Sequence, residues 1–159
     1  MAKKIPYGLT DYVLVMTDNY YYVDKTQYID LLEQTGRFLF LIRPRRFGKS
    51  LFLNMLNCYY DVKYADRFEE LFGNQYIGKH PTAEQGKYLV LRFNFSMVRA
   101  TDDKLEAAFN RHISLETAYF ASVYASYFKP DFQEQLKLIP EAAGRLEYIC
   151  LCAKEQGLS

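Results

Sequence analysis

The sequence predicts an α/β fold: a three-layer αβα domain that is incomplete within the chain and has a helix-rich C-terminal half. The run at 37–42 is uninterrupted and apolar after one charge, which is typical of a parallel strand covered on both faces, and the mainly apolar stretch at 88–95 predicts a second strand. A short basic loop and a helical pattern follow the first run, which gives the order strand, loop, helix. After residue 102, apolar residues recur at helical spacing to about residue 155.

The composition is that of one globular domain. The chain has 159 residues, of which 50% are hydrophobic and 25% charged, so it can bury a core. Its net charge of +1 gives no overall attraction to nucleic acid or anionic lipid, so any anion site must be local. No apolar run approaches the roughly 18 residues of a membrane span. The N-terminus has no apolar stretch typical of a signal peptide, so a cytoplasmic protein is expected.

Cysteines and aromatic residues are expected to serve packing. Cys58, Cys150 and Cys152 have no C-x-x-C spacing and are expected to be buried thiols in a reducing cytosol. His80 and His112 stand in unrelated segments, so no zinc site is predicted. The 15 Tyr and 12 Phe residues mostly alternate with apolar residues, which favours core packing over stacking with nucleic-acid bases.

The first half of the chain is expected to alternate short elements and turns. Thr26 is a plausible N-cap of a helix that extends to Gln34, and Gly36 stands where a C-terminal cap belongs. The strand at 37–42 comes next, followed by the basic loop and a helix over 49–60.

The second half begins with a short helix at 67–72 and a surface connection at 75–86. The second strand, at 88–95, follows. A long helix then opens at Asp102 or Asp103 and ends at Lys129-Pro130. Two more helices are predicted, one restarting at Asp131 and one spanning about 141–155, where Gly157 stops it.

The basic loop spans 43–50 and reads Arg-Pro-Arg-Arg-Phe-Gly-Lys-Ser. In a phosphate-binding loop, backbone N–H groups at a helix start surround the phosphates, and glycine is needed where a side chain would block them. Gly48 fits that role, Lys49 that of the cation for the β- and γ-phosphates, and Ser50 that of the magnesium ligand. The full pattern has a further glycine at the position of Arg43. An accidental Gly-Lys-Ser at a helix start is the alternative interpretation.

We therefore predict a site for ATP, or another nucleoside triphosphate, with Mg²⁺. Ser50 is the expected metal ligand when nucleotide is bound. Arg45 or Arg46 is expected to add positive charge around a polyphosphate, although ordinary surface charges are the alternative. The expected nucleotide-binding residues are Arg43, Arg45, Arg46, Phe47, Gly48, Lys49, Ser50 and Leu51.

Three blocks in the first third of the chain carry a family resemblance. They are Ile5-Pro6-Tyr7-Gly8, Tyr21-Tyr22-Val23-Asp24-Lys25-Thr26 and the loop extended to Leu51. In their order and spacing the chain resembles the bacterial AAA-ATPase-like domain, a P-loop NTPase often fused to a C-terminal PD-(D/E)xK nuclease-like domain. An Arg-Pro-Arg-Arg loop is usual in that family, so the resemblance implies that Arg43 is a family variation.

The resemblance also implies what hydrolysis would require. A strand ending in acidic residues (Walker B) normally holds magnesium and activates water, and no apolar run after Ser96 ends in Asp or Glu. Residues 1–159 are therefore expected to form a single partial domain that ends before the acidic strand, and no catalytic residue is predicted. Such a domain is expected to be marginally stable, with an exposed sheet edge prone to association. The acidic residues Asp61, Asp66, Glu69 and Glu70 are expected to be solvated.

Two functions remain open at this point, besides nucleic-acid binding through the loop arginines, Arg92 and Arg99, against which the near-neutral net charge argues. One is a nucleotide-binding module that does not itself support hydrolysis; the other is a non-catalytic protein-interaction fragment with a vestigial loop. The expected partners are a nucleotide and either the remainder of the same protein or another chain, with no membrane and no nucleic acid. Asp24 and Lys25 either contact base or ribose or cap the following helix, and capping with local packing is favoured.

Overall fold

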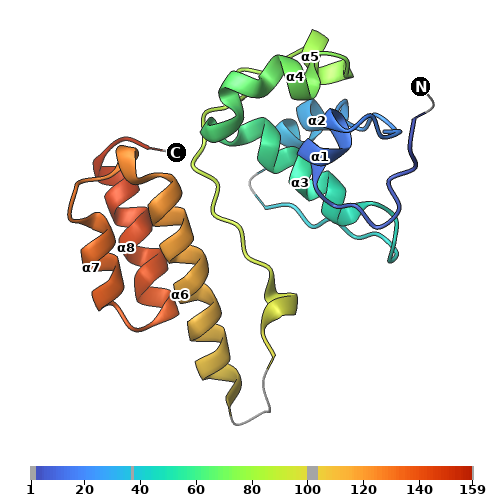
Figure 1. Ribbon diagram of the computed structural model, residues 1–159. Coiled ribbons are helices and arrows are strands. Elements are labelled where there is room, and N and C mark those ends of the chain that lie inside the picture. The colour runs from blue at the N-terminus through green and yellow to red at the C-terminus, as the bar shows by residue number, and fades with distance from the viewer. Residues whose placement is uncertain (1–2, 37, 100–103, 159) are drawn as a thin grey trace. The chain divides into compact units, whose positions relative to one another are not determined.

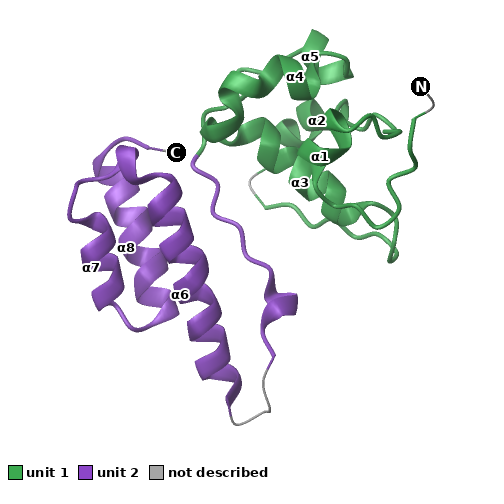
Figure 2. Cartoon of the chain, in the orientation of Figure 1, with its two compact units in different colours: residues 1–88 green, residues 89–159 purple. Residues whose placement is uncertain are grey.

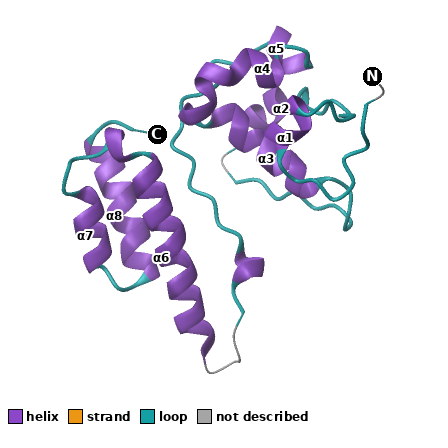
Figure 3. Ribbon diagram, viewed as in Figure 1, coloured by secondary structure: helices purple, strands orange, loops and turns teal. Residues whose placement is uncertain are grey.

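The computed structural model describes residues 3–36, 38–99 and 104–158, as Figure 1 shows. The chain separates into two compact units, Met1–Tyr88 and Leu89–Ser159 (Figure 2). Helices and loops make up both units (Figure 3). Each unit has its own buried core, and each is described by itself below. The expectation of a single partial domain stays a prediction.

The predicted three-layer αβα fold is wrong, because the described residues form no sheet. Neither apolar run is a strand, although Arg37 of the first run lies outside the described residues. Pairing is limited to isolated bridges, between Lys4 and Tyr20 and between Asp61 and Tyr88. A strand persists only where a neighbour exchanges backbone hydrogen bonds with it along its length. The predicted burial is wrong as well, since no residue of 38–42 or 88–95 is buried, and no described segment pairs with either run beyond Tyr88.

The first run is instead an extended segment with one exposed face. The side chains of Phe38, Phe40 and Ile42 are 91%, 92% and 90% exposed. Leu41 is partly buried and packs against the core of the first unit. This alternation is the period of two that an extended chain imposes on its side chains. The predicted exposed sheet edge is wrong, because the described residues form no sheet. This segment instead exposes a row of apolar side chains, Phe38, Phe40 and Ile42.

The first unit is built from short helices around an aromatic core. Tyr12 of α1 stacks on Phe72 of α4, with ring centroids 5.1 Å apart, and donates a hydrogen bond to the carbonyl of Leu71. The helices are α1 (Tyr12–Thr17), α2 (Tyr28–Thr35), α3 (Lys49–Tyr60), the 3₁₀ helix η1 (Val62–Arg67), α4 (Phe68–Phe72) and α5 (Tyr76–Lys79). The buried core consists of Tyr12, Ile29, Phe52, Met55, Cys58, Tyr59, Leu71, Phe72 and Ile77.

Most helices of this unit agree with the sequence predictions. Helix α3 has the predicted bounds, and α2 ends at Gly36, whose φ of 125° few other residues adopt. Thr26 is not the N-cap of α2, which begins after Gln27 without a side-chain cap. The predicted surface connection at 75–86 is wrong in part, because it contains α5 and the fully buried Ile77.

In the described part of the second unit, α6 (Leu105–Val123) packs against both α7 (Phe132–Leu138) and α8 (Ala142–Glu155), as Figure 1 shows. The short 3₁₀ helices η2 (Phe95–Met97) and η4 (Ala125–Tyr127) precede and follow α6. The predicted start of α6 at Asp102 or Asp103 lies outside the described residues. Its predicted end is wrong, since α6 stops at Val123. The helices expected after Asp131 and over 141–155 are confirmed.

A buried arginine joins two helices of this unit. The Arg145 guanidinium of α8 donates to the carbonyl of Ile139 at 2.7 Å and to that of Lys137 at 3.4 Å. These carbonyls lie at the C-terminal end of α7, where they have no intrahelical partner. Among the helices of the described residues, none has the length and apolarity that crossing a membrane requires.

Candidate functional site

The basic loop leads directly into α3, with Gly48 as the residue before the helix. Gly48 has φ 74°, in the left-handed region, and Arg46 has φ 68°. The first intrahelical bond is donated by the N–H of Phe52 to the carbonyl of Gly48, at 2.9 Å. The N–H groups of Lys49, Ser50 and Leu51 precede that bond, so they have no intrahelical acceptor. Gly48 has no side chain to cap them, which leaves these donors for another acceptor.

A cavity of about 740 Å³ lies against this helix start. Residues 5–10 form one wall, and the loop with the first turn of α3 forms the other. Of the predicted nucleotide-binding residues, Arg43 and Phe47 do not line the cavity. Those that do are Arg45, Arg46, Gly48, Lys49, Ser50 and Leu51.

Positive charge is concentrated at this cavity. Arg45, Arg46 and Lys49 are exposed, and none of them forms an ion pair with a described residue. The start of α3 adds the positive end of the helix dipole. The result is a local positive site on a nearly neutral chain. Within the described ranges, no cluster of three or more His, Cys, Asp or Glu is placed to hold a metal ion.

The Asp24–Thr26 segment is anchored to the start of α5. One oxygen of the Asp24 carboxylate accepts from the N–H of Thr26 at 2.8 Å and from its hydroxyl at 2.7 Å. The other oxygen accepts from the N–H of Tyr76 at 2.7 Å, and the Thr26 hydroxyl accepts from the N–H of Ile77 at 3.1 Å. Capping is therefore found, but at α5 and not at the helix that follows in sequence.

Lys25 lies beside the basic loop, a placement that sequence reasoning missed. Its ammonium nitrogen is 3.9 Å from the position that a Cβ would occupy on Gly48. A second cavity, of about 220 Å³, is lined by Lys25 and shares Pro6, Gly48 and Leu51 with the first. The signal in the sequence was that Lys25 and Pro6 belong to the blocks carrying the family resemblance, from which contact of Lys25 with base or ribose was the less favoured alternative.

The four acidic residues after α3 differ in exposure, since one of them is buried and three are exposed. Asp61 is 1% exposed, so its predicted solvated position is wrong; its carboxylate accepts from the N–H of Lys63 at 3.0 Å. Asp66, Glu69 and Glu70 are exposed as predicted. The Arg67 guanidinium lies 2.7 Å from the Glu70 carboxylate, and its hydrogen bond lowers the pKa of Glu70.

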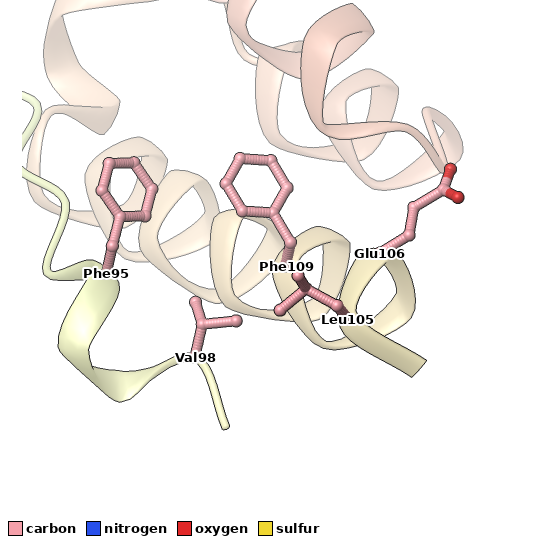
Figure 4. Close-up of a pocket in the computed structure, with 5 residues that line it drawn as sticks. All are labelled: Phe95, Val98, Leu105, Glu106 and Phe109. Carbon is pink, nitrogen blue, oxygen red and sulfur yellow. The ribbon is translucent and has the colours of Figure 1, made fainter. Parts of the chain in front are cut away.

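The second unit has an apolar cavity of about 620 Å³ between the segment after Tyr88 and α6. Figure 4 shows the rings of Phe95 and Phe109 next to each other and the Glu106 carboxylate pointing away from them. The two rings stack with centroids 5.7 Å apart. The lining offers apolar side chains and a carboxylate, which suits no anionic ligand.

The first unit is therefore a helical unit in which a basic, glycine-containing loop precedes a helix beside a cavity. The chain belongs to the family described as "Predicted AAA-ATPase", which it matches over residues 6–150. It is also similar to an "Uncharacterized protein in vnfD 5'region" of Azotobacter chroococcum mcd 1, with 51% identity over 55 residues. That stretch covers 34% of this chain but only 11% of the relative's length. No solved structure matches the chain.

Proposed function

We propose that the chain is a nucleotide-binding module of an AAA-ATPase-like protein, with the phosphates of a nucleoside triphosphate bound at the start of α3. The observation that carries the proposal is the coincidence of three features at one place. Free backbone donors, three cationic side chains and a cavity of about 740 Å³ all occur at the basic loop. Such a helix start is a general binding site for phosphate groups.

The residues at this position fit a triphosphate chemically. The positive φ of Gly48 exposes the N–H groups that follow it, and the absence of a Cβ keeps the approach open. Lys49 would supply a point charge to the phosphates and Ser50 a hydroxyl ligand to Mg²⁺. Arg45 and Arg46, on the same cavity, would neutralise further phosphate charge.

The proposal is limited to binding. A bound Mg²⁺ would screen the phosphate charge at Ser50, but no hydrolytic step is assigned to residues of this chain. The family resemblance further suggests that a nuclease-like domain accompanies this module in the whole protein. The gene sequence beyond the Ser159 codon would test that part, and an open frame without such a domain would contradict it.

A thermal-shift titration tests the proposal. A ligand that binds only the folded state at 100 times its dissociation constant adds about 2.7 kcal/mol to the unfolding free energy. ATP with Mg²⁺ is therefore expected to raise the melting temperature with increasing concentration. AMP, which lacks the β- and γ-phosphates, is the matched ligand control and is expected to have a smaller effect. Equal shifts from ATP and AMP would argue against phosphate-chain recognition.

Protein interaction is a second candidate function, and one observation favours it. Phe38, Phe40 and Ile42 form an exposed apolar row immediately before the loop. Under this hypothesis the loop no longer binds nucleotide, and the row contacts another polypeptide. A chain whose melting temperature is unchanged by every nucleotide, but which binds a protein partner less tightly after Phe40→Ser, would favour this function.

A further inference from the structure

Lys25 is held in place by its two neighbours in sequence. Asp24 accepts hydrogen bonds from Thr26 and from the N–H of Tyr76, and the buried Thr26 accepts from the N–H of Ile77. The carbonyl of Lys25 itself accepts from the N–H of Tyr28 at 3.2 Å. The backbone of Lys25 is thus fixed to two helices. Its side chain consequently starts from a defined point beside the basic loop.

The charge of Lys25 is not neutralised within the described part of the chain. Its side chain is partly buried, and no described carboxylate lies within the 4.0 Å of an ion pair. Both oxygens of the adjacent Asp24 carboxylate are already engaged with N–H and hydroxyl donors. The Lys25 ammonium therefore has no counter-ion among the described residues, so its charge is available to a negatively charged ligand.

Lys25 adds a further positive charge to those near Gly48. Lys25 lies in the smaller cavity, whereas Arg45, Arg46 and Lys49 lie in the larger one, and Gly48 borders both. The ammonium of Lys25 is 3.9 Å from the Cβ position of Gly48, close to the positive end of the α3 dipole. Mutual repulsion among these groups disfavours the arrangement, and an anion extending over Gly48 would offset it.

We propose that Lys25 is a second phosphate-binding cation of the basic loop, beside Gly48 in a cavity that adjoins the one lined by Lys49. The inference rests on the proposed function and deepens it. Since Gly48 borders both cavities and each is lined by at least one cation, the ligand class is a chain of two or more phosphates. A nucleoside triphosphate and inorganic tripolyphosphate share that chemistry. The role differs from the alternatives weighed from the sequence, which were helix capping and contact with base or ribose.

The test is isothermal titration calorimetry of the full chain with two probes, ATP and inorganic tripolyphosphate, each with Mg²⁺. Lys25→Gln is expected to weaken the binding of both probes by about tenfold or more, the usual effect of losing one charge-assisted hydrogen bond. Lys25→Arg keeps the charge and is expected to restore most of the affinity. Lys79→Gln removes an exposed lysine of α5 that lines neither cavity and is expected to leave affinity unchanged.

The outcomes separate this inference from the proposed function. If Lys25→Gln binds both probes as the wild type does while Lys49→Ala loses binding, the role of Lys25 is wrong and the function stands. If Lys25→Gln weakens ATP but not tripolyphosphate, Lys25 contacts base or ribose and the inference is overturned. If the wild type binds neither probe, both fail. If Lys25→Gln is unfolded and Lys25→Arg neither folds nor binds, the role of Lys25 is structural, and that result also overturns the inference.

Discussion

The ammonium of Lys25 lies 3.9 Å from the point where a Cβ would project from Gly48. This relationship connects the segment anchored at Asp24 with the loop that opens α3. Position 48 is restricted because a residue other than glycine is strained at a φ of 74°, and its Cβ would lie in van der Waals contact with the Lys25 ammonium.

Gly48→Ala tests this restriction. We expect a loss of about 1 kcal/mol in unfolding free energy, because an L-residue is strained in the left-handed region, together with weaker ATP binding. Urea denaturation and calorimetry would measure the two effects. Gly157→Ala is the matched control, since Gly157 has a similar φ of 66° with open space around it. The Gly157→Ala variant is expected to lose stability but to keep its ATP affinity. If Gly48→Ala bound ATP as tightly as the wild type, the site would be wrong.

Asp24→Ala removes the anchor of Lys25. It leaves the N–H of Tyr76 without its acceptor and the Thr26 hydroxyl without one partner. We expect a loss of about 1–3 kcal/mol in unfolding free energy, the usual cost of breaking hydrogen bonds to a charged group. Urea denaturation would measure it, with the exposed Asp66→Ala as control. Equal stability of the two variants would mean that the Asp24 contacts do not hold this segment.

The exposed row before the loop predicts self-association. Phe40→Ser is expected to shift the chain toward monomer in sedimentation experiments while leaving the unfolding free energy within about 0.5 kcal/mol, because the side chain is 92% exposed. Phe72→Ala, at a fully buried position, is the contrasting variant and is expected to lose about 3–5 kcal/mol. An unchanged oligomeric distribution in Phe40→Ser would show that the row does not drive association.

Stability is expected to fall at alkaline pH. Burial raises the pKa of the Cys58 thiol from 9.0 to about 12, and burial also raises the pKa of Tyr12 and Tyr22. Between about pH 9 and 12 the unfolded chain releases these protons while the folded chain keeps them, so unfolding becomes more favourable as pH rises. Urea denaturation at pH 8, 9 and 10 would measure the decline. Cys58→Ala should reduce it between pH 9 and 10, and a pH-independent stability would contradict the assignment.

Helices were predictable from the sequence where caps and periodicity agreed. The bounds of α3 follow from apolar spacing after Gly48, and α8 follows from Pro140 and Gly157. Helix α5 was missed because a four-residue helix carries no period, and its buried Ile77 is held through Thr26, which is distant in sequence.

The two predicted strands are wrong because an apolar run does not specify a partner strand, and without one neither segment is paired or buried. In residues 38–42 only Leu41 is partly buried, and no partner strand is present among the described residues. The loop residues of the site were predictable because a local motif carries them. Lys25 and Pro6 were not, since their approach to Gly48 depends on tertiary packing that no local pattern records.

The central claim is that the start of α3 binds the phosphates of a nucleotide, and calorimetric titration of ATP with Mg²⁺ tests it most directly. Lys49→Ala is expected to weaken binding at least about tenfold relative to the wild type, because one phosphate-contacting charge is lost. Lys79→Ala serves as the matched control and should bind as the wild type does. Equal affinity of the wild type and Lys49→Ala, or no binding by the wild type, would contradict the account.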